Sequence, residues 1–227
     1  MKPVLIYSMP RTRSTAAMQA CKRPVKVNEP FAFHNTPTYN ENGMGCLSRI
    51  RSLIDYEQSE KWNQVFEEMK QPDTVVKIFG SDLLYYYNAR DWFKDADTSY
   101  EIFTLIRNPR ETILSSLLAQ HFGHWTGAET RVRELIIHDQ EFCNIETAFS
   151  SFLRFYPKSS RLITFENLPE EFFDKSQIWH ENQHSMRRLH LIKNLDRVEE
   201  NVNTILRYFE KEWKDVTGLD IHTLLPY

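Results

Sequence analysis

Residues 2–20 read KPVLIYSMPRTRSTAAMQA, and this stretch largely determines the fold that the chain is predicted to adopt. Residues 4–7 form a short apolar run with β-branched and aromatic members between two prolines, which is typical of a buried strand. From Ser14 onward, small residues follow hydroxyl residues that can cap a helix. The turn between strand and helix holds Arg11 and Arg13.

A strand, a tight turn and a helix N-terminus together predict an anion site. Unpaired backbone N–H groups point outward at such a turn, and the helix dipole favours negative charge there. Two arginines add permanent charge and forked donors that suit phosphate or sulfate oxygens. The alternative is an ordinary strand and capped helix whose two arginines are solvated.

The rest of the chain alternates between apolar strands and helices. Strands are predicted to begin near residue 25 and to cover residues 74–79, 100–106 and 161–165. Helical spacing of apolar residues predicts helices over 48–70, after 81–82, from 109, and over 130–138, 141–156 and 195–213. This alternation predicts an α/β fold with a parallel sheet, built as one domain over 1–227 with a more helical part from about 170.

Composition limits the possible partners. The net charge of −3 gives no global basic field, so we expect no nucleic-acid partner and only a local positive site. Three scattered cysteines form neither a disulfide framework nor a metal cluster. No apolar stretch approaches the roughly 18 residues of a membrane span. We therefore expect a soluble, cytoplasmic protein.

Charged residues stand at or near the carboxyl ends of three predicted strands, where parallel sheets bind their ligands. They are the arginines of the first turn, Lys77, and Arg107, which Ser115 follows eight residues later. A lysine inside an apolar strand needs a partner unless the strand is at the edge and the side chain extends to water. The first turn lacks the glycines and lysine of a Walker A loop, which argues against a magnesium-dependent kinase.

Four segments together resemble the PAPS-dependent sulfotransferases. Residues 10–15 (PRTRST) resemble the 5′-phosphosulfate loop of that family, and residues 107–115 (RNPRETILS) resemble its 3′-phosphate motif. Residues 28–31 (NEPF) are similar to a Glu-Pro-Phe element of bacterial and carbohydrate-directed branches. Residues 165–168 (FENL) are similar to a strand-end Tyr-Glu-Asp-Leu element. The resemblance implies a three-layer, P-loop-NTPase-like fold with a central parallel sheet of about four to five strands.

The resemblance also implies roles for individual residues. Arg11 contacts the 5′-phosphosulfate and stabilises the leaving oxygen, and the same group is held by the backbone and hydroxyls of the loop residues Thr12, Arg13, Ser14 and Thr15. Arg107 and Ser115 bind the 3′-phosphate. Lys77 lies near the transferred group. Our own candidate for the general base is Glu29, because it lies in a loop that can reach the mouth of the site, and His34 in the loop after it is the second candidate.

The chain departs from the family pattern at three places. Arg13 stands where many members have glycine, and Phe79 stands where the cytosolic branch has a histidine after the strand lysine. The C-terminal glycine-rich segment of that branch is missing, so Arg187, Arg188 or Lys193 is a candidate for completing the 3′-phosphate site.

Further side chains could line an acceptor pocket or hold a metal. The tyrosines at 85–87 could line an acceptor pocket, although packing and surface roles explain them better. His121 and His124 lack a third ligand at a recognisable spacing, so no metal site is predicted.

The expected function is metal-independent transfer of a sulfuryl group from PAPS to a hydroxyl or amine of a small-molecule or carbohydrate acceptor. Two alternatives stay open: a kinase-like phosphotransferase with a degenerate phosphate loop, and an inactive module that binds nucleotides or other anions.

Overall fold

The computed structural model describes residues 1–30, 67, 69–85, 87–122, 134–177 and 186–222. Its strands are β1 (Val4–Ser8), β2 (Val25–Asn28), β3 (Thr74–Phe79), β4 (Glu101–Ile106) and β5 (Arg161–Thr164). Its α-helices are α1 (Ser14–Ala20), α4 (Asp82–Tyr85), α5 (Tyr87–Ser99), α6 (Pro109–Phe122), α7 (Phe142–Arg154) and α8 (Leu195–Thr217). Three short 3₁₀ helices, η1 (Asp139–Glu141), η2 (Lys175–Gln177) and η3 (Met186–Leu191), complete these elements.

The five strands form one parallel sheet in the order β2-β3-β1-β4-β5. The strand β1 lies at the centre, with Ile6 opposite Lys77 of β3 on one side and opposite Phe103 of β4 on the other. Strands buried on both faces carry near-continuous apolar sequence, which is the pattern seen here. The predicted α/β fold with a parallel sheet of about four to five strands is confirmed.

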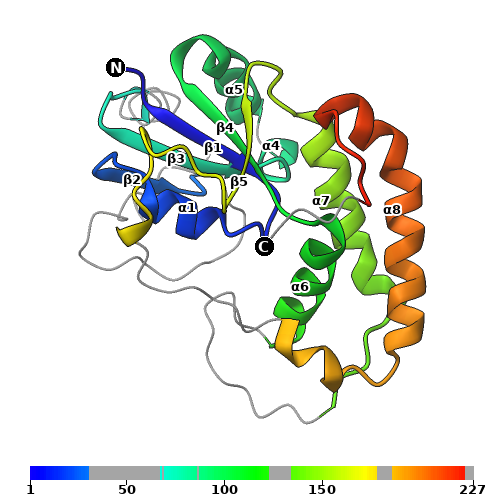
Figure 1. Cartoon of the computed structure of the whole chain (residues 1–227). Helices are drawn as coiled ribbons and strands as arrows, with labels where there is room; N and C mark the ends of the chain where they lie inside the picture. The colour runs from blue at the N-terminus through cyan, green and yellow to red at the C-terminus, as the bar shows by residue number, and fades with distance from the viewer. Residues whose placement is uncertain (31–66, 68, 86, 123–133, 178–185, 223–227) are drawn as a thin grey trace, which may run out of the picture.

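Successive residues of each strand face opposite sides of the sheet, so the sheet separates two hydrophobic layers. Leu5 and Tyr7 of β1 belong to the larger cluster, together with apolar residues of α5, α6, α7 and α8. Val4 and Ile6 belong to the smaller cluster, which packs on α1. Figure 1 shows α1 on one side of the sheet and α6, α7 and α8 gathered on the other. The three-layer arrangement is therefore present.

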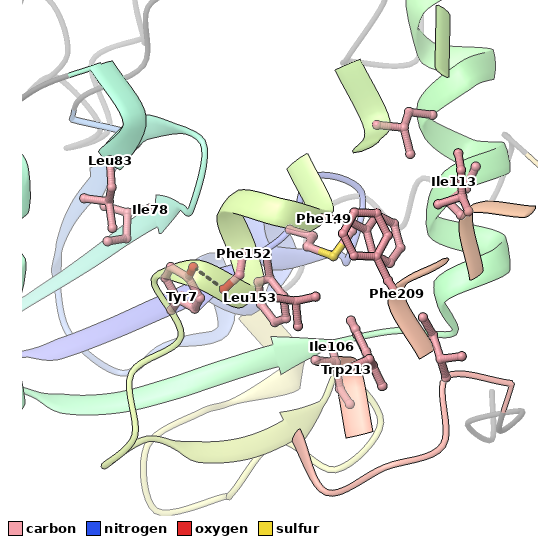
Figure 2. Packing of buried hydrophobic residues seen from close by; sticks show 14 of the residues in the cluster. Tyr7, Ile78, Leu83, Ile106, Ile113, Phe149, Phe152, Leu153, Phe209 and Trp213 are labelled. Carbon is pink, nitrogen blue, oxygen red and sulfur yellow. Dashed lines mark hydrogen bonds between the residues drawn. The ribbon is translucent and has the colours of Figure 1, made fainter. Parts of the chain in front are cut away.

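The larger cluster is rich in aromatic rings (Figure 2). Phe152 of α7 stacks on Tyr7, with ring centroids 5.3 Å apart, and also on Trp213 of α8 at 5.7 Å. The Tyr7 hydroxyl donates a hydrogen bond to the Phe152 carbonyl oxygen at 2.8 Å. These contacts attach α7 and α8 to the central strand close to its carboxyl end.

One predicted helix is wrong in the part that the structure describes. Residues 134–138 of the expected helix 130–138 are extended, and Leu135 forms a parallel bridge with Ile192. Leu135 and Ile137 are buried while Ile136 between them is 55% exposed, which is a period of two rather than a helical period. Most of the expected helix 48–70 lies outside the described residues.

The strand order places a topological switch point at the carboxyl edge of the sheet. The helix after β1 covers one face and the helix after β4 covers the other. In open parallel sheets, ligands bind where neighbouring strands send their helices to opposite faces. The loops that follow β1 and β4 meet at this point.

Candidate functional site

The loop after β1 has an unusual backbone conformation. Arg11 has φ 67° and Arg13 has φ 63°, in the left-handed region that favours glycine. The Thr12 hydroxyl donates to the Met9 carbonyl oxygen at 2.9 Å, which closes the turn. Arg13 stands where the family resemblance expects glycine, and it adopts a positive φ in spite of its side chain. Such strain of about 1–3 kcal/mol per residue is concentrated at functional sites.

Glu29 is the third non-glycine residue with positive φ in the described part of the chain, at 49°. It directly follows β2, and its backbone N–H donates to the Lys77 carbonyl oxygen at 2.8 Å. All three residues in this conformation are therefore at the carboxyl edge of the sheet.

Lys77 is buried at the centre of the site. Its ammonium group lies 2.6 Å from a carboxylate oxygen of Glu29 and donates to the Thr15 hydroxyl at 2.8 Å. Its side chain is 1% exposed, and β3 lies between β2 and β1 in the sheet. An edge-strand lysine that extends to water is therefore excluded. Lys77 connects the candidate base to the first helix.

Two hydrogen bonds that run in opposite directions join the first turn to the segment of β4 and α6. The Arg11 Nε donates to the Ser115 hydroxyl on α6 at 3.1 Å. The Arg107 Nη1 donates to the Arg11 carbonyl oxygen at 3.4 Å. The first turn and the β4–α6 junction thus form one connected structure, although 96 residues separate the two arginines.

Glu111 orients the Arg107 guanidinium. A single oxygen of this buried carboxylate lies 3.1 Å from Nε and 3.0 Å from Nη2 of Arg107. Burial lowers the pKa of Arg107, and the Glu111 charge acts against that change. Burial and the neighbouring Arg107 charge likewise lower the pKa of Arg11. Two crowded cations of this kind favour the binding of an anion between them.

Arg13 and Ser14 of the same loop have different surroundings. The Arg13 guanidinium lies 5.2 Å from the centre of the Phe165 ring and 3.2 Å from the Glu166 carboxylate, beyond the end of β5. It is also the N-cap of α1 and makes no side-chain capping bond. Because α1 has only seven residues, the positive charge of the site comes mainly from side chains. Ser14 is buried at the start of this helix.

Asp82 is a further site residue, which was not among the residues predicted from the sequence. Its carboxylate is buried at the start of α4 and accepts a hydrogen bond from the Phe79 N–H at 2.9 Å. Burial, followed by the Glu29 charge, raises its pKa to about 7. An acidic residue two positions after Gly80, where β3 has just ended, is the sequence signal that could have identified it.

Several predicted site residues are not tested by this geometry. His34, His124 and Tyr86 lie outside the described residues. The Lys193 ammonium lies 2.7 Å from the Glu134 carboxylate and is more than half exposed. His121 contacts the Glu141 carboxylate. Among the described residues, no group of three or more potential ligands is arranged to hold a metal ion.

The fold and the site define a parallel α/β protein whose carboxyl sheet edge gathers three buried or half-buried cations with a carboxylate beside them. No model of a known protein family matches the chain, and a comparison with curated proteins finds no match either. None of the described helices is both long enough and apolar enough to span a bilayer.

Proposed function

We propose that this chain is a sulfotransferase that moves a sulfuryl group from PAPS to a hydroxyl or amine of a small-molecule or carbohydrate acceptor. One observation carries the proposal. Arg11 and Arg107 follow the strands β1 and β4, Lys77 lies near the end of the neighbouring strand β3, and the three residues converge at the carboxyl edge of the sheet. The four sequence segments that resemble the PAPS-dependent family agree with this arrangement.

The residues present fit a ligand with two anionic ends. Arg107 and Ser115 would hold the 3′-phosphate, while Arg11 and the loop 12–15 would hold the 5′-group. Glu111 already fixes the plane of the Arg107 guanidinium, so little side-chain entropy remains to be lost on binding. PAPS supplies the activated sulfuryl group once it is bound.

The transfer needs a base on one side of the sulfur and stabilised negative charge on the other. In this proposal Glu29 accepts the acceptor proton as the new bond to sulfur forms. The bond from sulfur to the phosphate oxygen breaks at the same time, and Arg11 and Lys77 stabilise the charge left on that oxygen. The contact of 2.6 Å between Lys77 and Glu29 supports the proposal, because it brings the base and one of the cations into the same site.

The proposal includes a cytoplasmic location. Cys21 and Cys143 are free cysteines, and reduced thiols are typical of that compartment.

A transfer assay with labelled PAPS and a panel of sugar, phenol and amine acceptors tests the proposal, with a chelator present. We expect Glu29→Gln to lower the transfer rate by about 100-fold or more while the protein still binds adenosine 3′,5′-bisphosphate. Glu199→Gln is the matched control, since Glu199 pairs with Arg110 on the helical side of the molecule.

Three results would contradict parts of the proposal. Full activity of Glu29→Gln would assign the base to another residue, with His34 the next candidate. Bisphosphate binding without transfer to any acceptor would support the inactive binding module. Phosphoryl transfer from ATP that needs magnesium would support the kinase.

A further inference from the structure

Asp82 is a buried carboxylate that the proposed transfer does not use. It begins α4, directly after the turn at Gly80 that follows β3, and is 7% exposed. Its Oδ2 accepts the Phe79 N–H, three residues earlier, so this bond points the carboxylate back toward β3. That orientation directs it to the strand that carries Lys77.

The charged and titratable groups that face Asp82 come from each element around it. Lys77 of β3 lowers the pKa of Asp82, whereas Glu29 after β2 raises it. Tyr7 of β1 is also close: burial raises the pKa of its hydroxyl well above the ordinary value, and the Asp82 charge adds to that rise. From α5, Arg90 donates to the carbonyl oxygens of Leu83 and Leu84.

Lys77 thus has two carboxylates near it and one positive charge to balance them. The charge of Glu29 already matches that of Lys77, at a contact of 2.6 Å. An ionised Asp82 adds a second, unmatched negative charge in a buried place, which is costly. Burial first, and the Glu29 charge after it, therefore raise the pKa of Asp82 to about 7.

The same ammonium contacts the first helix through Thr15. An anion bound at that loop would add negative charge beside Lys77, Glu29 and Asp82, and it would attract the Lys77 ammonium. Like charges raise the proton affinity of a carboxylate.

We propose that Asp82 is a positioning residue, which takes up a proton from solvent when an anionic donor binds beside Lys77 and so leaves the ammonium to the anion. This inference rests on the proposed function, since it needs an anion at the loop. Binding and protonation are then linked, and each favours the other by the same factor. Donor affinity should therefore fall as the pH rises through the range in which Asp82 ionises.

Calorimetric titration with adenosine 3′,5′-bisphosphate, in buffers of different ionisation enthalpy, measures this proton directly. At about pH 7 we expect the wild type to take up as much as about half a proton more than Asp82→Asn. The asparagine retains an oxygen for the Phe79 N–H, and the difference between the two proteins cancels protons exchanged by the ligand phosphates. Glu199→Gln is the matched control, because Glu199 pairs with Arg110 and does not act on Asp82, and it should retain the uptake.

The dependence of affinity on pH gives a second measurement. Between about pH 6.5 and about pH 8.5 the dissociation constant of the wild type should rise several-fold more than that of Asp82→Asn. Binding with equal proton uptake in wild type and Asp82→Asn would overturn the role of Asp82 and leave the proposed function standing. Failure of the wild type to bind the bisphosphate at any pH would overturn both.

Discussion

At the scale of single residues, the proposed function assigns donor binding mainly to Arg11 and Arg107. Each would contribute a charge-assisted contact, typically worth about 1.5–3 kcal/mol. We therefore expect Arg11→Ala and Arg107→Ala each to weaken the binding of adenosine 3′,5′-bisphosphate by about 10- to 100-fold. Calorimetric titration measures the loss, and circular dichroism checks that the fold is retained.

Arg110→Ala is the matched control for these variants. Arg110 is on the same helix as Ser115, but it pairs with Glu199 and its side chain is 44% exposed. We expect the Arg110→Ala variant to bind the bisphosphate with the same affinity as the wild type. Equal affinity in Arg11→Ala or Arg107→Ala would show that the corresponding arginine does not contact the ligand.

Asp82 makes a prediction about stability in the ligand-free protein. Its pKa is about 7 in the folded chain, against 3.8 for the ordinary group. Between those values the unfolded chain binds fewer protons than the folded chain, so stability falls as the pH rises from about 4 to about 7 and is then level. The slope from this one group is at most about 1.4 kcal/mol per pH unit.

Denaturant unfolding of wild type and Asp82→Asn at several pH values measures that slope. The asparagine has no charge to bury, so the variant should be more stable than the wild type at neutral pH, and the two should converge toward pH 4. Two parallel curves would mean that Asp82 titrates normally in the folded protein.

At the scale of elements, Gly80 allows β3 and α7 to approach each other closely. A methyl group at this position would lie 2.6 Å from the Tyr7 hydroxyl and 2.7 Å from the backbone nitrogen of Phe152. Backbone atoms cannot move aside as easily as the end of a flexible side chain. We therefore expect Gly80→Ala to lower the free energy of unfolding by about 1–3 kcal/mol. Thermal or denaturant unfolding measures the change.

Gly218 provides the comparison for that variant. It ends α8 with φ 75°, and nothing lies within 4 Å of the position of an added methyl group. Gly218→Ala should therefore cost only the backbone strain of about 1 kcal/mol. A smaller loss for Gly80→Ala than for Gly218→Ala would contradict the close packing of α7 against the turn after β3.

The elements show which parts of the fold the sequence could predict. Strands 74–79 and 161–164 were expected almost to the residue, because buried parallel strands are short apolar runs with distinct boundaries. Residues 134–138 were wrongly expected to be helical. Leu135, Ile136 and Ile137 are consecutive, so the sequence gives them no period of two, and their burial alternates only in the fold. The bridge partner of Leu135 is Ile192, 57 residues away, which no local pattern contains.

At the scale of the whole molecule, the site forms where three separated segments meet. The sequence indicated Arg11, Lys77 and Arg107 because each stands at or near the carboxyl end of a strand, and a parallel sheet brings such ends together. It could not indicate the partners of these residues. Glu111 is recognisable as a site residue only once its burial and its contact with Arg107 are known.

The central claim is that this edge of the sheet binds a nucleotide with a 3′- and a 5′-anion. A thermal-shift titration without magnesium, comparing adenosine 3′,5′-bisphosphate with ATP, tests it most directly. A ligand at about a hundred times its dissociation constant stabilises the fold by ~2.7 kcal/mol, which is roughly 5–11 °C for a chain of this size. We predict a shift of that order with the bisphosphate and a much smaller one with ATP. No shift with the bisphosphate, or a shift with ATP that appears only with magnesium, would contradict the claim.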